Sequence, residues 1–279
     1  MKSAAFNYVR AASVEQAIGA LSSAGDAYSK LLGGGQSLGP MLNLRLVQPE
    51  HLIDLSKLPA LRQWSVQDET LRIGAGVRHA EVEDGKLEDV TRGLLPHVAG
   101  GIAYRAVRNR GTIGGSLAHA DPAADWVATM RLLDAGLRLQ GPDGERVLAA
   151  REFFLGAFTT AMHEHEVLVG IDVPVFSGSA RWAYQKLCRK PGEFAEALAA
   201  IWVDPPKGVY RMVVGALSGV PLLIEGESAL EALRSDAGRL AALDKAGVSD
   251  PVQRQQQATI MRRALTVLDC FGKDKGLTS

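Results

Sequence analysis

The sequence predicts an α+β fold in two parts. Short apolar runs typical of strands alternate with helical patterns before Pro174, and no period of about 20 to 50 residues repeats. After Pro174 the pattern changes to strand-like runs followed by helical stretches. The segment "VPVFSGSA", which contains Pro, Gly and Ser, separates the two parts. We therefore expect one domain over residues 1–175 and a second over 176–279.

The N-terminal part begins with a helix that is followed by short strands. Ser13 and Gln16 have the spacing of a capping box, and apolar residues then recur at helical intervals, which predicts a helix over 14–23. The runs "YSKLL" and "HLIDL" predict two short strands, and "TLRIGAG" predicts a third. The run "LRLQGPDGERVLA" predicts a hairpin about its Gly-Pro-Asp-Gly turn.

One further helix is expected in the N-terminal part, and strands and helices in the C-terminal part. Asp121 and Pro122 have the pattern of an N-cap and a first helical residue, so we expect a helix from there to Gly136. In the C-terminal part, "RWAYQKLC", "ALAAIWV" and "YRMVVGAL" predict three strands, and helical patterns lie near 227–245 and 253–271.

Composition excludes several classes of partner and cofactor. The chain has 279 residues, and 31 Lys and Arg balance 31 Asp and Glu, so no net field favours nucleic acid or an anionic membrane. Its two cysteines, Cys188 and Cys270, provide neither a disulfide framework nor the ligands of an iron–sulfur cluster. Because the N-terminus has no signal-peptide pattern and no apolar run reaches the ~18 residues of a membrane span, we expect a cytoplasmic protein.

Two glycine-rich segments are the strongest functional signal. The first is Gly33–Gly35 followed by Gln36 and Ser37, and the second is 112–116, "TIGGS". Glycines allow backbone N–H groups to converge on one point, the arrangement that binds phosphate oxygens without a charged side chain. One such segment is most often a tight turn, but two of similar composition favour a shared diphosphate ligand.

The standard nucleotide fingerprints do not fit the first segment. Pro40 and Met41 stand where a Walker A loop requires Lys and Ser or Thr, which argues against ATP hydrolysis. Leu38 occupies the last glycine position of a Rossmann fingerprint that would begin at Gly33.

The two segments together resemble a known family. "GGGQSLGPMLNLRL" and "RNRGTIGGSLAHADPAADW" are similar to the paired FAD-binding motifs of the flavin subunit of molybdenum hydroxylases, the group of carbon monoxide dehydrogenase medium subunits and the xanthine dehydrogenase FAD domain. The resemblance extends to "FNYVRAASVEQA", "EVLVGIDVP" and "AYQKLCRKPGEFAEA". It implies a two-subdomain FAD-binding fold of the vanillyl-alcohol oxidase (PCMH) type, with subdomains of about 1–57 and 58–175. It also implies a C-terminal α+β domain with a three-stranded sheet.

The resemblance also implies a set of FAD contacts. The two glycine segments are expected to surround the diphosphate, and Ala118 and Asp121 to approach the flavin ring or ribityl chain. The implied contacts are Leu31, Leu32, Gly33, Gly34, Gly35, Gln36, Ser37, Leu38, Ile102, Thr112, Gly114, Gly115, Ser116, Ala118, Asp121, Asp125, Leu168 and Lys186. The pattern alone would equally make Asp125 a favourable charge in a first helical turn and Lys186 a strand-edge lysine. No metal ligand or catalytic acid or base is expected.

The implied role is electron transfer. FAD on this chain would take electrons from a [2Fe-2S] small subunit, beside a large molybdopterin subunit in a dimer of heterotrimers, and pass them to an acceptor such as NAD or a quinone. Two alternatives stay open, a self-contained flavin oxidase of the same fold and a nucleotide-binding scaffold without turnover.

Two charged runs are weaker functional signals. The residues 163–166, "HEHE", are expected to be solvated. Arg105, Arg108 and Arg110 either attract phosphate or the acidic face of a partner, or they form a solvated surface.

Overall fold

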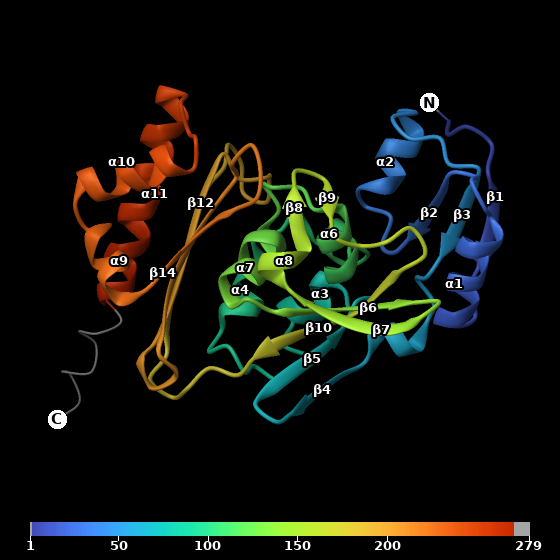
Figure 1. Cartoon of the computed structure of the whole chain (residues 1–279), viewed down its shortest axis with the longest axis horizontal. Coiled ribbons are helices and arrows are strands. Elements are labelled where there is room, and N and C mark those ends of the chain that lie inside the picture. The colour runs from blue at the N-terminus through green and yellow to red at the C-terminus, as the bar shows by residue number, and fades with distance from the viewer. Residues whose placement is uncertain (1, 271–279) are drawn as a thin grey trace.

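The computed structural model describes residues 2–270 and contains three main sheets arranged along its long axis (Figure 1). A three-stranded sheet at the N-terminal end is followed by a five-stranded sheet in the middle and a four-stranded sheet toward the C-terminal end. Among the described residues no helix is both long and apolar enough to cross a membrane.

The N-terminal sheet is parallel and small. Its elements are β1 (Asn7–Arg10), α1 (Val14–Ser23), β2 (Ser29–Leu32), α2 (Leu38–Asn43) and β3 (His51–Asp54), with the strand order β1-β3-β2. The predicted helix over 14–23 is confirmed as α1. The Ser13 hydroxyl accepts a hydrogen bond from the Gln16 N–H at 3.1 Å, as the capping pattern requires. The apolar face of α1 is buried, so local sequence and tertiary packing agree here.

The middle sheet is antiparallel and has the order β4-β5-β10-β6-β7. The predicted hairpin is confirmed as β6 and β7. This region contains η1 (Pro59–Arg62), β4 (Trp64–Gln67), β5 (Thr70–Gly74), α3 (His79–Glu83), α4 (Leu94–Gly100), α5 (Arg105–Arg108), α6 (Ile113–His119), α7 (Asp125–Leu133), β6 (Gly136–Gly141), β7 (Gly144–Ala149), α8 (Ala150–Phe153), β8 (Phe154–Gly156), β9 (Thr159–Thr160) and β10 (Val167–Pro174).

One helix in this region starts later than expected. The helix expected at Asp121 begins at Asp125, because the Asp121 carboxylate accepts the Ala123 N–H at 2.9 Å and closes a turn, and Ala124 has the extended backbone of the N-cap. The second glycine segment is the first turn of helix α6, with Thr112 as its N-cap. Glycine weakens a helix, so these glycines have a packing reason.

The C-terminal part contains one more strand than expected. Its elements are β11 (Arg181–Leu187), β12 (Ala197–Asp204), η2 (Pro205–Lys207), β13 (Val209–Gly215), β14 (Leu222–Glu225), α9 (Glu227–Ala232), α10 (Asp236–Lys245) and α11 (Pro251–Cys270). The fourth strand, β14, is short and pairs antiparallel with β13, so it depends on a neighbour rather than on a strong local pattern. Residue 271, the last of the expected final helix, lies outside the described residues.

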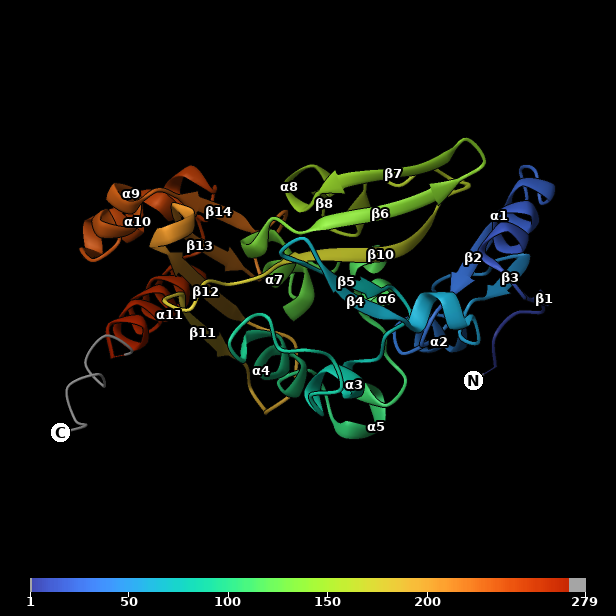
Figure 2. The ribbon, with the colours of Figure 1, turned by 90° about the horizontal axis from the view of Figure 1, so that it is seen from below.

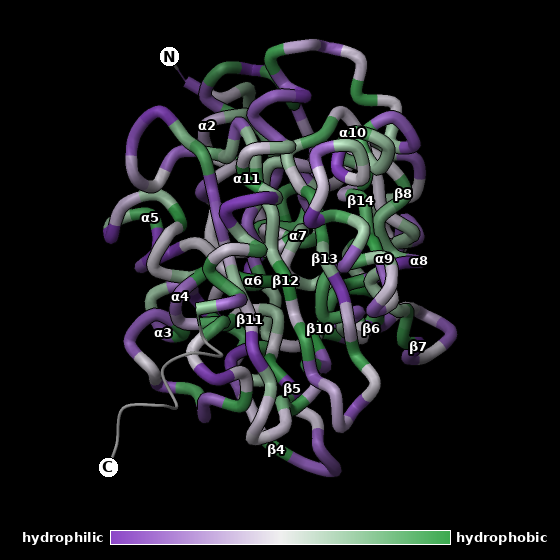
Figure 3. Tube along the Cα trace, turned by 90° about the vertical axis from the view of Figure 1, so that its left-hand side faces the viewer, coloured by the Kyte–Doolittle hydropathy of each residue, from purple (hydrophilic) through white to green (hydrophobic). Residues whose placement is uncertain are grey.

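Strand β12 explains how the two parts join. All eight of its residues are buried, and alternate side chains point to opposite faces of the sheet. Leu198, Ala200 and Trp202 belong to the core that contains α7, whereas Ala199 and Ile201 belong to the core under α9–α11. Figure 2 shows this sheet between α9–α11 on one side and α4 and α7 on the other. In Figure 3 the hydrophobic stretches gather around α7, β12 and β13 in the middle of the view.

Candidate functional site

A cavity of about 830 Å³ lies where the N-terminal sheet, helix α6 and the C-terminal part meet. Its size lies within the range of small-molecule and cofactor sites. It is lined by all of the implied contact residues except Leu32 and Lys186. The structure therefore brings together residues that are far apart in the sequence.

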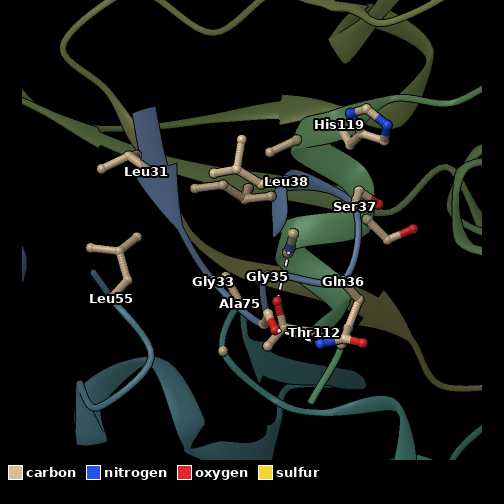
Figure 4. Close-up of a pocket in the computed structure, with 18 of the residues that line it drawn as sticks. Leu31, Gly33, Gly35, Gln36, Ser37, Leu38, Leu55, Ala75, Thr112 and His119 are labelled. Carbon is tan, nitrogen blue, oxygen red and sulfur yellow. Dashed lines mark hydrogen bonds between the residues drawn. The ribbon is translucent and has the colours of Figure 1, made fainter. Parts of the chain in front are cut away.

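The implied contacts come from several elements. Leu31 and Leu32 end β2, residues 33–37 connect it to α2, Leu38 begins α2, Ile102 follows α4, Thr112 caps α6, Gly114, Gly115, Ser116 and Ala118 lie in α6, Asp121 lies in the turn before α7, Asp125 begins α7, Leu168 lies in β10, and Lys186 lies in β11. Figure 4 shows the segment bearing Gly33, Gly35, Gln36 and Ser37 alongside α6.

The first glycine segment offers unused hydrogen-bond donors. Within the described residues, none of the backbone N–H groups of residues 33–37 donates to another protein group. Gly35 has φ +73°, a left-handed conformation that glycine adopts without strain, and the Gln36 side-chain amide donates to the Gly34 carbonyl at 3.1 Å. Consecutive free N–H groups in such a turn form a concave anion-binding site.

The other glycines of the site permit close packing. A Cβ on Gly34 would lie 2.7 Å from the Gly111 Cα and still closer to the Arg110 carbonyl oxygen, and a Cβ on Gly33 would lie 3.1 Å from the Thr112 Oγ1. A Cβ on Gly114 would lie 2.7 Å from the Ala75 carbonyl oxygen. The missing side chains therefore let the first segment approach residues 110–112, and let α6 approach Ala75, which follows β5.

The second glycine segment differs from the first in its hydrogen bonds. The Ile113 N–H donates to the Val77 carbonyl at 3.0 Å, and the Gly114 N–H donates to the Ala75 carbonyl at 2.9 Å. The Gly115 N–H donates to the Thr112 hydroxyl at 3.1 Å. Because the first N–H groups of α6 already have partners, the two segments do not offer equivalent sets of donors. The first segment provides the free donors, and α6 provides the facing surface.

Asp125 and Lys186 meet in a buried ion pair between the two parts of the chain. The Lys186 ammonium donates to both carboxylate oxygens of Asp125, at 2.9 and 3.0 Å, and the side chains are only 10% and 5% exposed. The Tyr184 hydroxyl donates to Asp125 Oδ1 at 2.6 Å. Burial, followed by the Asp125 charge, raises the pKa of Tyr184, so its hydroxyl keeps its proton and remains a donor.

This pair alters both single-residue interpretations. Asp125 lines the cavity, but its carboxylate is already bound by two groups from β11. Lys186 is not a solvent-exposed lysine, since its side chain is buried against the N-terminal part of the chain and also donates to the Gly101 carbonyl at 3.3 Å. Residues 184 and 186 point to the same face of β11, so two side chains of one strand bind the same carboxylate.

Sequence reasoning missed His79, a buried residue in the lining of the cavity. The Trp126 indole N–H donates to His79 Nδ1 at 3.0 Å, so a neutral imidazole must carry its proton on Nε2. Burial, and then the Arg108 charge, lowers the pKa of His79 to about 4, which keeps the ring neutral near pH 7. A lone histidine outside a recognised motif gives no sequence signal. Gly192 and Phe194 were also missed, although they fall within a stretch that resembles the family.

The "HEHE" run is only partly solvated. The His163 side chain is 73% exposed, as expected, but Glu166 is buried in the cavity lining. Arg146 Nε donates to Glu166 Oε1 at 2.7 Å, and this hydrogen bond lowers the pKa of the Glu166 carboxyl. Within residues 2–270 no group of three or more His, Cys, Asp and Glu is placed to hold a metal ion.

Comparison with known proteins decides the family. Residues 4–176 match the family model described as the FAD binding domain in molybdopterin dehydrogenase, which covers more than half of the chain. The chain belongs to this family. It is 38% identical over 255 residues to the carbon monoxide dehydrogenase medium chain of Hydrogenophaga pseudoflava, an alignment that covers 91% of this chain and 86% of that protein. It is 35% identical over 204 residues to the caffeine dehydrogenase subunit beta of Pseudomonas sp. (strain CBB1), covering 73% and 69%.

Solved structures agree with this result. Carbon monoxide dehydrogenase from Hydrogenophaga pseudoflava matches with a TM-score of 0.86 and 34% identity, over 97% of this chain and 99% of that chain. Quinoline 2-oxidoreductase from Pseudomonas putida 86 matches with a TM-score of 0.84 and 29% identity, again over 97% and 99%. The predicted family, the FAD-binding fold and FAD as the cofactor are confirmed. The chain is a flavoprotein of an oxidoreductase family.

Proposed function

We propose that this flavoprotein is the electron-transfer subunit of a molybdenum hydroxylase. It takes electrons from a [2Fe-2S] cluster on a small partner subunit and delivers them to an external acceptor such as NAD or a quinone. The observation that carries the proposal is the row of free N–H groups at residues 33–37, which lie alongside α6 and line the same cavity of cofactor size. This arrangement suits the FAD diphosphate.

The residues present fit FAD in distinct ways. In this proposal residues 33–37 bind the diphosphate through their free backbone N–H groups, with Leu31, Leu32 and Leu38 on either side of them, and Thr112, Gly114, Gly115 and Ser116 hold it from the other side. Ile102, Ala118, Asp121, Asp125 and Leu168 line the remaining cavity, and Lys186 holds Asp125 from behind. The bound flavin supplies the redox chemistry, while the protein supplies its binding, orientation and electrostatic environment.

The partners follow from what the chain has and what its relatives are called. Its two cysteines lie on different elements, Cys188 after β11 and Cys270 at the end of α11, so they do not form a cluster site together. Relatives are named as a medium chain and as a subunit of a dehydrogenase complex. We therefore assign the iron–sulfur cluster to a small subunit and molybdopterin to a large one, assembled as a dimer of heterotrimers in the cytoplasm.

A spectroscopic experiment tests the function. The full chain is purified and its flavin spectrum recorded, the bound flavin is reduced with dithionite under anaerobic conditions, and reoxidation by NAD⁺ or a quinone is followed. The expected result is a yellow protein. Its reduced flavin is reoxidised by one of the acceptors, and its oxidised flavin is reduced by the co-expressed iron–sulfur subunit once that subunit has been reduced. A colourless chain that binds no added FAD would refute the proposal.

The same experiment separates the two alternatives. A self-contained oxidase would be reduced by a small organic substrate in the absence of any partner. A scaffold would bind FAD but would show no electron exchange with either the iron–sulfur subunit or an acceptor. Either outcome would contradict the electron-transfer role while leaving FAD binding in place.

A further inference from the structure

Arg108 lies on α5, outside the set of implied FAD contacts, and its side chain is only 11% exposed. Its Nε and Nη2 donate to the two oxygens of the Glu83 carboxylate, each at 2.8 Å. Its Nη1 donates to two backbone carbonyls, that of Ile102 at 2.9 Å and that of Ala103 at 2.8 Å. The planar guanidinium is therefore held in one orientation by a bidentate ion pair and fixes two adjacent carbonyls.

The turn that Arg108 holds forms part of the cavity wall. Ile102 and Ala103 both line the cavity, together with Gly192 from the loop between β11 and β12. The Ala103 N–H donates to the Gly192 carbonyl at 2.8 Å. A Cβ on Gly192 would lie 2.7 Å from the Ala103 carbonyl carbon, so the two backbones are in direct contact. At this point the first part of the chain meets the second beside the cofactor cavity.

The backbone of this turn is strained. Ala103 has φ +44°, in the left-handed region that residues with a Cβ rarely adopt. Such a conformation persists only when the surroundings determine it, and it is concentrated at ligand sites. Here both polar groups of Ala103 are bound, the N–H by Gly192 and the carbonyl by Arg108.

We propose that Arg108, oriented by Glu83, is a positioning residue for the flavin: it holds the strained Ile102–Ala103 turn against Gly192 and so sets the shape of the cavity wall between the two parts. This inference rests on the proposed FAD-dependent function. Arg108 acts on the flavin through the Ile102–Ala103 turn and is not a catalytic residue.

The chain contains a matched control one turn earlier on α5. Arg105 donates to Glu83 at 2.9 Å and to both oxygens of Asp84 at 2.6 Å, so it belongs to the same charge cluster. Among the described residues, its side chain donates to no carbonyl of the cavity wall, and its further hydrogen bond is to the Asn109 side chain at 2.9 Å. Removing Arg105 changes the same net charge on the same short helix but leaves the Ile102–Ala103 turn held.

The test compares R108M, R108K and R105M in the full chain. We measure FAD affinity by fluorescence titration of the apoprotein, the absorption spectrum of bound flavin, and its reduction potential. We expect R108M to weaken FAD binding about tenfold or more, as loss of charge-assisted bonds to two carbonyls implies, and to shift both the spectrum and the potential. R108K should show a similar spectral shift, since an ammonium does not reproduce the planar fork, and R105M should stay within about twofold of the wild type.

The outcomes separate this inference from the function on which it rests. If R108M and R105M have the same FAD affinity, spectrum and potential, Arg108 is not a positioning residue, although FAD binding stands. If the wild-type chain binds no FAD, the proposed function fails first. Should R108M not fold, R108K and G192A, which disturbs the same wall from the other part, decide the question: unchanged flavin spectra in both would overturn the inference.

Discussion

The first prediction concerns Gly34→Ala at the meeting point of the two glycine segments. The added Cβ would lie 2.7 Å from two backbone carbons, the Gly111 Cα and the Arg110 carbonyl carbon, and closer still to the Arg110 oxygen. That distance is 0.7 Å short of the 3.4 Å at which ordinary contact begins. Because the obstacle is backbone rather than a flexible side chain, the 33–37 segment must move away from residues 110–112.

The expected cost follows from this displacement. Forcing an extra methyl group into a well-packed region typically costs about 1–3 kcal/mol. If that cost falls on the geometry that receives the diphosphate, FAD affinity decreases by about 5- to 140-fold, at about 1.4 kcal/mol per tenfold change. Gly39→Ala is the matched control, since its Cβ would meet no atom of the described residues within 4 Å and its position inside α2 favours Ala by up to about 1 kcal/mol.

The assay is fluorescence titration of FAD into apoprotein, with circular dichroism to show that both variants are folded. We expect G34A to bind FAD weakly and G39A to bind as the wild type does. Equal FAD affinity of G34A and the wild type would refute the argument that close approach of the two segments forms the site. An equal loss in G39A would show that any methyl group near the segment is harmful, whatever its contacts.

Three other predictions follow from the buried groups around the cavity. D125A leaves the Lys186 ammonium buried without its partner and should lower the free energy of unfolding by about 3–5 kcal/mol in urea denaturation. The double variant D125A/K186M should lower it by less than the sum of the two single changes. Simple additivity would show that the pair is not coupled. For His79 the folded pKa of about 4 lies below the ordinary 6.5, so the unfolded chain takes up the proton first and stability is lost as pH falls from 6.5 to about 4. Relative to H79Q, the wild type should lose about 3 kcal/mol over that range, and parallel pH profiles of the two would contradict a buried neutral histidine. E166Q should remove part of the loss of stability at acid pH. The hydrogen bond from Arg146 lowers the Glu166 pKa, so this stabilisation is present above the ordinary carboxyl pKa and is lost as the pH falls below it. An unchanged acid side of the pH profile of unfolding would show that the pair does not contribute.

Local features of the chain were predictable because their causes are local. Helix α1 follows from the Ser13 cap and a helical apolar period, and the β6–β7 hairpin follows from its turn residues. The helix expected at Asp121 failed because the same side chain can close a turn as well as cap a helix, and both use a carboxylate accepting a nearby N–H. Strand β14 was missed because it exists through pairing with β13.

The two glycine segments and their likeness to a flavoprotein family are properties of the sequence. They were sufficient for the fold class and the cofactor, and all but two of the contact residues they implied line the cavity. The hydrogen bonds of the two segments could not be predicted from the sequence, because the N–H groups of Ile113 and Gly114 donate to the carbonyls of Val77 and Ala75, which are far away along the chain. The Asp125–Lys186 pair and the Arg108-held wall likewise join segments that only folding brings together. Sequence patterns report which groups can bind, whereas the competition among distant partners for each donor and acceptor is decided in three dimensions.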